Sequence, residues 1–252
     1  MRGRPVLVQA CLNGGRRRAE HPAVPLSPDE IARDAARAVA AGAAALHVHP
    51  RAADGSETLD PTICDAVVAA VRAVCPGIPI GLTTGIWIEP APARRLELVT
   101  AWAVAPDFVS VNLSETSVPE LCDRLLARSI GIEAGVWTVD DARTLAALGI
   151  ADRCVRVLVE AQPSEARAAV DEARAIDDEL DRVGIRVPRL HHGDGLATWA
   201  VIDAALERDR DIRIGLEDTA QRPDGSPALH NADLVEAAVA MVRRRGRSRT
   251  SF

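Results

Sequence analysis

Short runs rich in β-branched and other apolar residues alternate along this chain with stretches that have the periodicity of amphipathic helices. This alternation constrains the fold more than any other feature of the sequence. Eight strands are predicted, at residues 5–13, 45–51, 79–85, 108–114, 132–138, 154–160, 187–193 and 211–218. Each is followed by a predicted helix, at residues 27–42, 61–74, 91–103, 118–129, 139–148, 164–183, 196–208 and 231–244.

Eight strand–helix units in 252 residues fit an α/β fold of the (β/α)8 TIM-barrel type, which typically needs about 250 residues. The strands are mostly continuous apolar runs, as is typical of a parallel sheet covered by helices. A doubly wound open sheet is the alternative, and it is less favoured because no strand is followed by a G-x-G-x-x-G motif. No change in composition marks a domain boundary, so one TIM-barrel domain is expected over residues 1–252.

The chain ends in an arginine-rich stretch that begins at about residue 243. We expect this stretch to be a frayed and solvated tail. Contacts between subunits, or attraction of an anionic cofactor, are the alternatives.

All 30 basic residues are arginine, and the chain contains neither lysine nor tyrosine. The absence of a side-chain amine excludes Schiff-base aldolase chemistry, lysine-anchored pyridoxal phosphate and a P-loop. The formal net charge is −6 and aromatic residues make up 2% of the chain. A nucleic-acid partner is therefore not expected, because phosphate neutralisation and base stacking both lack the residues they need.

Five cysteines are scattered along the chain without a C-x-x-C pair. This pattern is typical of a reducing compartment and not of a disulfide framework. The N-terminus lacks the apolar segment of a signal peptide, and no segment approaches the roughly 20 apolar residues of a membrane helix. We therefore expect a cytoplasmic protein that does not contact a membrane.

Two histidines stand near the end of the second predicted strand, where a TIM barrel gathers its functional groups. Side chains two residues apart on a strand share a face, so His47 and His49 point the same way. They can bind one divalent ion, although a hydrogen-bonded pair of core histidines is the alternative. Glu217, at the end of the eighth predicted strand, could reach in from about 10 Å away and complete a His–His–Glu set with an open coordination position.

The same strand end supplies two further charged groups. Arg213 shares the strand parity of Glu217 and would sit below it in the barrel. Asp218 has the opposite parity, so it can face the site only if the strand has already become a loop; otherwise it caps the following turn. His191 or His192, on the seventh predicted strand, is a rival metal ligand.

Other predicted strand ends contribute polar groups that are each more often structural than functional. The glycine of the third strand end would let a ligand approach the backbone. The arginine-rich loop after the first strand suits a carboxylate or a phosphate, or is simply a solvated basic loop. The candidate substrate-binding residues are Asn13, Arg16, Pro50, Thr84, Gly85, Ser110, Asn112 and Glu133.

Motifs over nearly the whole chain resemble those of the beta-keto acid cleavage enzymes, the family of 3-keto-5-aminohexanoate cleavage protein. The H-x-H motif and the R-x-G-L-E-D motif are specific when they occur together. The matching segments are residues 10–14, 26–32, 41–43, 47–49, 82–85, 110–112, 133, 213–219 and 231–235.

The resemblance implies a zinc-dependent TIM barrel that is usually a homo-oligomer, a dimer or a tetramer. It implies that the enzyme converts a beta-keto acid and acetyl-CoA into acetoacetate and a new CoA thioester. By position, the metal ligands would be His47, His49 and Glu217. Asp218, held by Arg213, would be the general base.

Two further roles follow from the same resemblance. Thr83 would stand beside the substrate and Glu133 would be an acidic residue of the site. In the implied chemistry the metal acts as a Lewis acid, and an enolate forms when the base removes the C2 proton. The enolate then attacks the thioester, CoA is transferred within the adduct, and a retro-Claisen step releases acetoacetate. No step needs a lysine, in agreement with the composition.

The chain departs from the family pattern at two places. Arg16 stands where the member that acts on an amino-substituted substrate has an acidic residue, and an arginine would repel an ammonium group. An uncharged or anionic beta-keto acid is therefore predicted. Ile86 replaces a second glycine, and residues 86–88 add bulk that would narrow the pocket.

Three other functions remain open from the sequence. The first is a metal-dependent aldolase or lyase that uses the same ligands without CoA. The second is a non-catalytic relative that binds a metal or CoA. The third is hydrolysis by zinc-bound water, which the same ligand set would suit.

Overall fold

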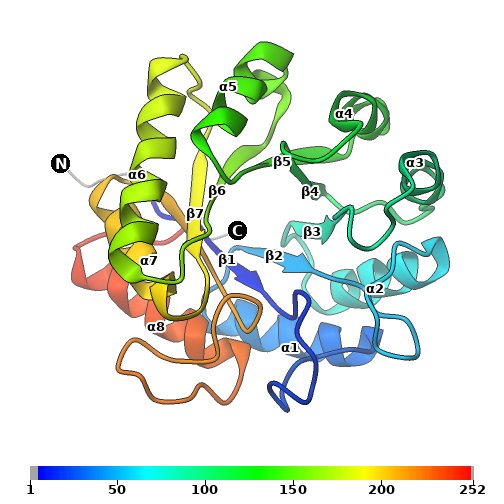
Figure 1. Ribbon diagram of the computed structural model, residues 1–252. Helices are drawn as coiled ribbons and strands as arrows, with labels where there is room; N and C mark the ends of the chain where they lie inside the picture. Colours follow the sequence, from blue (N-terminus) through cyan, green and yellow to red (C-terminus); the bar gives the residue numbers. More distant parts are fainter. Residues whose placement is uncertain (1–4, 251–252) are drawn as a thin grey trace.

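The computed structural model describes residues 5–250, which form a closed barrel of parallel strands surrounded by helices (Figure 1). This confirms the predicted TIM barrel. The strands are β1 (Val8–Cys11), β2 (Ala45–Val48), β3 (Ile80–Thr83), β4 (Phe108–Asn112), β5 (Gly131–Val136), β6 (Arg156–Ala161), β7 (Arg189–Gly193) and β8 (Asp211–Ile214). The helices are α1 (Pro28–Ala41), α2 (Pro61–Val74), α3 (Pro92–Thr100), α4 (Val118–Ala127), α5 (Val139–Leu148), α6 (Ala166–Arg182), α7 (Thr198–Glu207) and α8 (Asn231–Arg244).

Each strand pairs with its neighbours in sequence order, and β8 closes the barrel against β1. In this register Cys11 lies beside His47, and Gln9 lies beside Arg213. Strand β1 is therefore the only spacer between β2 and β8 in the barrel wall. This closure brings residues about 170 positions apart in sequence to one end of the barrel.

Helix boundaries follow local signals in the sequence. Ser27 accepts a hydrogen bond from the backbone of Glu30, whose carboxylate accepts one from the Ser27 backbone in return, so α1 begins with a complete capping box. Helix α5 has the same arrangement at Thr138 and Asp141. Each box satisfies two backbone N–H groups that a helix N-terminus would otherwise leave without a partner.

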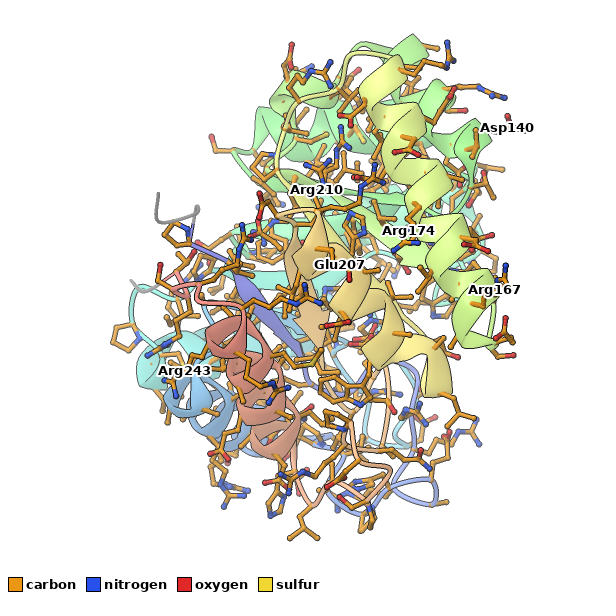
Figure 2. The ribbon with its side chains drawn as sticks, turned by 90° about the vertical axis from the view of Figure 1, so that its left-hand side faces the viewer. Asp140, Arg167, Arg174, Glu207, Arg210 and Arg243 are labelled. Atoms are coloured by element: carbon orange, nitrogen blue, oxygen red, sulfur yellow. The ribbon has the colours of Figure 1, made fainter. Side chains whose placement is uncertain are left out.

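Alternate side chains of each strand face the two layers of the fold. On β2, Leu46 and Val48 pack into the apolar layer between strands and helices, whereas His47 lies on the barrel side. Ion pairs join neighbouring helices at the surface. Figure 2 shows one of them, between Arg174 of α6 and Glu207 of α7, whose Nη2 and Oε2 atoms are 3.2 Å apart.

The strands are shorter than predicted, and at β8 the difference matters. The strand was expected to run to Asp218 but ends at Ile214. Backbone N–H groups of Asp218 and Thr219 both bond to the carbonyl of Gly215, at 2.9 and 3.0 Å, so the chain turns there. A Cβ atom at Gly215 would lie 1.9 Å from the carbonyl oxygen of Cys11, so the close approach to β1 requires a glycine.

The arginine-rich tail differs from the frayed segment we expected, as far as Thr250. The backbone of Val6 accepts a hydrogen bond from Thr250 and donates one to Ser248, both at 2.9 Å. Arg247 forms an ion pair with Asp209. Because Val6 precedes β1 and Asp209 precedes β8, the tail lies at the end of the barrel opposite the carboxyl ends of the strands. Within residues 5–250, no helix combines the length and the apolar character that crossing a membrane requires.

Candidate active site

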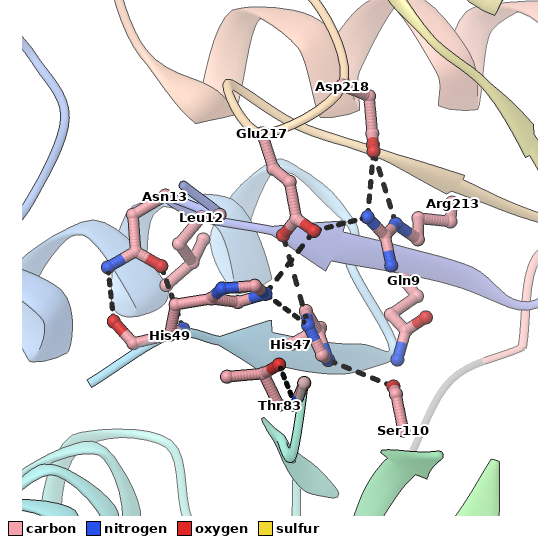
Figure 3. A network of polar contacts seen from close by, with 12 residues as sticks. Gln9, Leu12, Asn13, His47, His49, Thr83, Ser110, Arg213, Glu217 and Asp218 are labelled. Carbon is pink, nitrogen blue, oxygen red and sulfur yellow. Dashed lines mark hydrogen bonds and ion pairs between the residues drawn. The ribbon is translucent and has the colours of Figure 1, made fainter. Parts of the chain in front are cut away.

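His47, His49 and Glu217 converge at the carboxyl end of the barrel (Figure 3). The Nε2 atoms of the two imidazoles are 3.0 Å apart. Glu217 places Oε1 3.4 Å from Nε2 of His49 and Oε2 3.9 Å from Nε2 of His47. The predicted grouping of these three residues is therefore present in the fold.

The loop after β8 delivers Glu217 across the end of β1. The Glu217 backbone N–H bonds to the carbonyl of Cys11 at 3.3 Å. A Cβ atom at Gly14 would lie 2.2 Å from Cγ of Glu217, and Gly14 also has a φ of +52°. Both the contact and the left-handed backbone favour glycine, so Gly14 makes room for the carboxylate to reach β2.

A second partner orients each imidazole through its other nitrogen. Nδ1 of His47 lies 3.3 Å from Oγ of Ser110, which donates to Oε2 of Glu133 at 2.8 Å. Nδ1 of His49 lies 2.5 Å from Oε1 of Glu57. Such contacts fix the tautomer and leave Nε2 free to bind a cation, the usual arrangement of a histidine ligand.

Glu57 is a residue that the sequence reasoning missed. It lies in the loop between β2 and α2, and also accepts hydrogen bonds from the indole of Trp87 at 3.2 Å. A glutamate in an acidic loop carries no signal of its own in one sequence. The only available hint was that a histidine ligand commonly needs a carboxylate partner.

The charges of the cluster favour a cation. Burial lowers the pKa of His47 well below its usual value, so this imidazole is neutral. Burial would raise the pKa of Glu217, but Arg213 and the two histidines outweigh it and hold that pKa well below its usual range. Burial lowers the pKa of His49, but the carboxylates of Glu217 and Glu57 outweigh it and raise the pKa to about 9. A bound cation would displace this proton.

The three donor atoms fit a divalent metal ion. They lie within 4.8 Å of one another, and in residues 5–250 they are the one set of three or more His, Cys, Asp and Glu side chains that meets this condition. Oε2 of Glu217 is buried and has no hydrogen-bond partner. A buried carboxylate oxygen without a partner is costly, and a cation would satisfy it. Two imidazoles and one carboxylate leave a position open, as in catalytic zinc sites.

Asp218 lies next to this cluster because the chain turns after β8. Its Oδ1 accepts hydrogen bonds from Nε and Nη2 of Arg213, at 3.2 and 3.0 Å. The same guanidinium donates to Oε1 of Glu217 at 2.5 Å. Oδ2 of Asp218 is buried and has no partner. The site therefore contains a fixed carboxylate with one free oxygen, held by the guanidinium that also contacts Glu217.

The two adjacent histidines of β7 face opposite sides of the barrel wall. His191 lies toward α6, with Nε2 3.4 Å from Oδ1 of Asp177. His192 lies toward Asp218, with Nδ1 3.2 Å from Oδ1 of that residue. Neither histidine joins the potential metal cluster.

Several residues predicted to bind substrate have partners within the protein. The side chain of Asn13 bonds to both backbone groups of His49, at 2.8 and 2.9 Å, and so fixes that residue (Figure 3). The hydroxyl of Thr84 donates to the carbonyl of Ser110 at 2.7 Å. The amide of Asn112 donates to Glu115 at 2.8 Å. Contact of these side chains with a substrate stays a prediction.

The other predicted residues lie around the cluster. The Thr83 hydroxyl accepts a hydrogen bond from the backbone of Gly85 at 3.2 Å, and Pro50 is buried directly after His49. Nε of Arg16 donates to the backbone carbonyl of Glu217 at 3.2 Å, which places Arg16 beside the site. We expected Gly85 to leave space for a ligand. Instead, the Trp87 ring occupies that space, 2.4 Å from where a Cβ atom would lie.

A cavity of about 710 Å³ opens beside His49. Its walls include Trp87 and Ile88, in the segment predicted to add bulk, and Glu57, the partner of His49. The Trp87 and His49 rings are nearly parallel, with centroids 6.5 Å apart. Three arginines, Arg17, Arg18 and Arg51, also line the cavity.

Comparison with known proteins shows the family of this chain. The family model of beta-keto acid cleavage enzymes matches residues 5–251. A 3-keto-5-aminohexanoate cleavage enzyme from Fusobacterium nucleatum is 27% identical over 260 residues, which cover 96% of this chain and 93% of that protein. The enzyme of the same name from Acetoanaerobium sticklandii is 23% identical over 278 residues, with the same coverage.

Solved structures of ObcA share the fold. A ternary complex of ObcA with a C4-CoA adduct and oxalate superposes with a TM-score of 0.77 at 17% identity. A binary complex of ObcA with oxaloacetate superposes with a TM-score of 0.75. Both comparisons cover 91% of this chain and 65% of the ObcA chain, so this protein spans just under two thirds of that length. From the family match over nearly its whole length, the chain belongs to the beta-keto acid cleavage enzymes.

Proposed function

We propose that this protein is a zinc-dependent enzyme that condenses a beta-keto acid with acetyl-CoA and yields acetoacetate and a new acyl-CoA. One observation carries the proposal. Asp218 has a buried oxygen without a partner, and a single guanidinium joins this residue to Glu217 of the His47 and His49 cluster. A base beside a cation site is what removal of a proton next to a keto group requires.

His47, His49 and Glu217 would hold the zinc ion. Once bound, the ion would supply Lewis acidity toward the keto oxygen and the carboxylate of the substrate. The protein contributes the orientation of its ligands: Ser110 and Glu133 fix His47, and Glu57 and Asn13 fix His49.

Asp218 would act as the general base through Oδ2. The proton leaves C2 of the beta-keto acid and is held on Oδ2, while Arg213 keeps Oδ1 in place. A carboxylate is a weak base for carbon, so the position of Asp218 against the C–H bond must supply the advantage. The resulting carbon nucleophile forms a bond to the acetyl carbonyl of acetyl-CoA, and the CoA thiolate that leaves adds to the former keto carbon of the beta-keto acid. The bond between that carbon and C2 then breaks, which releases the new acyl-CoA and the carbanion of acetoacetate. The same carboxylate returns its proton to this carbanion.

Arg16 is proposed to select the substrate by charge. It lies against the backbone of Glu217 at the entrance to the site, and its side chain is a quarter exposed. A guanidinium there disfavours an ammonium substituent and accepts an uncharged or anionic one. We propose that the cavity with Arg17, Arg18 and Arg51 admits the acetyl-CoA, whose phosphates suit guanidinium groups.

The direct test is an assay of acetoacetate formed by zinc-loaded enzyme with acetyl-CoA and a panel of beta-keto acids with neutral, acidic and amino substituents. We expect turnover that requires both acetyl-CoA and a neutral or acidic keto acid. Turnover without acetyl-CoA would indicate a lyase or aldolase, and cleavage of acetyl-CoA without a keto acid would indicate a hydrolase. Preference for 3-keto-5-aminohexanoate would contradict the role of Arg16.

Assembly and location are part of the same proposal. By resemblance to its family we propose a homo-oligomer, a dimer or a tetramer, that acts in the cytoplasm. Light scattering of the purified protein measures the first, and fractionation of the source cells measures the second.

A further inference from the structure

His192 occupies a position that the proposed chemistry does not yet use. It is buried on β7, with 6% of its surface exposed. Nδ1 lies 3.2 Å from Oδ1 of Asp218 and 3.3 Å from the backbone carbonyl oxygen of Gly193. Nε2 has no hydrogen-bond partner and lies 3.4 Å from Oε2 of Glu160, on the neighbouring strand β6. The register pairs His192 directly with Glu160. The imidazole thus stands between two carboxylates inside the barrel.

Two cationic or donor groups hold the same oxygen of Asp218. Arg213 contacts Oδ1 from one element, and His192 contacts it from another. Oδ2 is left buried and without a partner. Arg213 is shared with Glu217, so its position depends on that residue as well. Within residues 5–250, His192 forms no hydrogen bond or ion pair with His47, His49 or Glu217. It therefore contacts Asp218 independently of the metal cluster.

The two neighbouring carboxylates, Asp218 more than Glu160, favour the protonated form of this imidazole. Burial and Arg213 lower the pKa of His192, but the carboxylates of Asp218 and Glu160 outweigh them and raise it to about 9. The ring therefore carries a proton on each nitrogen at neutral pH, and Nδ1 can donate to Oδ1. If Nδ1 carried no proton, its lone pair would face the carboxylate oxygen and the contact would be repulsive.

We propose that His192 is a positioning residue for Asp218: it donates from Nδ1 to Oδ1, shares that oxygen with Arg213, and so aims the free Oδ2 at the C2 hydrogen of the beta-keto acid. This inference deepens the proposed function and rests on it. The atom that takes the proton is Oδ2 of Asp218; His192 neither accepts nor delivers it. Losing the Nδ1 donor would let the carboxylate rotate about its own bond and lower the fraction of the time that Oδ2 faces the substrate.

Two substitutions separate the two nitrogens of the ring. His192→Asn retains an amide donor near the position of Nδ1, toward Asp218, and loses the atom near Glu160. His192→Gln places its amide near the position of Nε2, toward Glu160, and loses the donor to Asp218. A structural role in filling space predicts that both variants behave alike, whereas the positioning role predicts that they differ. His191→Asn is the matched control, because His191 lies toward Asp177 on the helix side of β7.

The readout is exchange of the C2 hydrogens of acetoacetate with deuterium oxide, followed by proton NMR on zinc-loaded enzyme without acetyl-CoA. Acetoacetate is the probe because it is the proposed product and itself a beta-keto acid. We expect His192→Gln to slow enzyme-dependent exchange about 10- to 100-fold, the loss typical of a hydrogen bond to a charged group. His192→Asn should recover most of the rate, His191→Asn should keep it, and zinc content should stay the same in all three.

Each outcome decides one of the two claims. Wild-type enzyme that gives no exchange above buffer would contradict the proposed function, and with it this inference. Exchange by the wild type together with equal rates in His192→Gln and His192→Asn would overturn only the positioning role. If His192→Gln does not fold, His192→Leu provides the second test, because it fills a similar volume and has no donor toward Asp218; an exchange rate in a folded His192→Leu enzyme equal to that of His192→Asn would also overturn it.

Discussion

Two buried carboxylates, Asp177 and Asp218, lie on opposite sides of strand β7, beside His191 and His192 respectively, and differ in how many of their oxygens have partners. Both oxygens of Asp177 have partners: Oδ1 is 2.7 Å from Nη1 of Arg189, and Oδ2 is 2.9 Å from Nη2 of Arg210. Asp218 has partners on Oδ1 alone, and its Oδ2 is buried and free. A saturated carboxylate fixes the fold, whereas a half-satisfied one has an oxygen left for a ligand or a proton.

The pKa of Asp177 follows from this saturation. Burial would raise it, but His191, Arg189 and Arg210 outweigh burial and hold it well below its usual range. Asp177 therefore stays ionised and paired, and it ties α6 to Arg189 at the start of β7 and to Arg210 just before β8. Both carboxylates are buried and contact arginines, so these features do not separate a structural carboxylate from a functional one. The oxygen without a partner on Asp218 does.

Replacing Asp218, the carboxylate with one free oxygen, should have the largest effect on turnover. Asp218→Asn keeps the size of the side chain and removes the base, so we expect turnover to fall about 10²- to 10⁴-fold. The thermal midpoint should stay close to that of the wild type, because Arg213 and His192 keep Glu217 and Glu160 as counter-charges. Steady-state acetoacetate assays and a melting curve measure both. A variant with nearly full turnover would remove Asp218 from the proposed mechanism.

Replacing Asp177, whose two oxygens both have partners, should lower stability and leave turnover unchanged. Asp177→Asn leaves the arginines around α6 without a full counter-charge, and we expect the free energy of unfolding to fall by about 3 kcal/mol. The partners Arg208 and Arg210 are partly exposed, which keeps the loss at the lower end for a buried pair. Turnover of the folded variant should match the wild type. Urea unfolding measures the change in stability. A stable but inactive Asp177→Asn variant would show that Asp177 serves the reaction and not the fold.

A smaller effect, on zinc affinity, is expected for Glu57, which contacts the proposed ligand His49 but is not itself a ligand. Glu57→Gln removes the charge that orients His49, so the affinity for zinc should fall about 10- to 100-fold. Competition with a chromophoric chelator measures it. Glu20→Gln, on the exposed loop near Arg16, is the control and should leave zinc affinity unchanged. Equal zinc affinity in wild type and Glu57→Gln would show that the His49 contact does not support the metal.

The smallest expected effect concerns charge selection at the entrance. Arg16→Glu should shift the ratio of kcat/KM values for amino-substituted over neutral keto acids by about fivefold, as expected for a partly exposed charge. The matched control Arg33→Glu changes the same charge on the exposed face of α1, outside the cavity. If both variants shift the ratio equally, the effect comes from the overall charge of the protein and not from the position of Arg16.

The sequence was sufficient for the barrel and for two of the proposed ligands. Strand parity alone placed His47 and His49 on one face, and capping signals such as Ser27 with Glu30 marked the beginning of α1. Helices α2, α5 and α8 begin and end where the apolar periodicity predicted. These features depend on residues a few positions apart, so local rules suffice for them.

Features that depend on long-range packing were not predictable. Strand parity left Asp218 undecided, because the end of β8 is set by the contact of Gly215 with Cys11, across the barrel closure. The contact of Glu57 with His49 depends on how an irregular loop folds back. The tail looked like a solvated segment because its pairing with Val6 joins the two ends of the chain.

The claim on which the rest depends is that His47, His49 and Glu217 bind one divalent cation together. Zinc titration of the metal-free protein, compared with the Glu217→Gln variant, tests it most directly. We predict one zinc ion per chain in the wild type and at least about a tenfold weaker binding in the variant, which keeps the shape of the side chain but not its charge. A wild-type protein that binds no zinc, or a variant that binds it as tightly, would contradict the account.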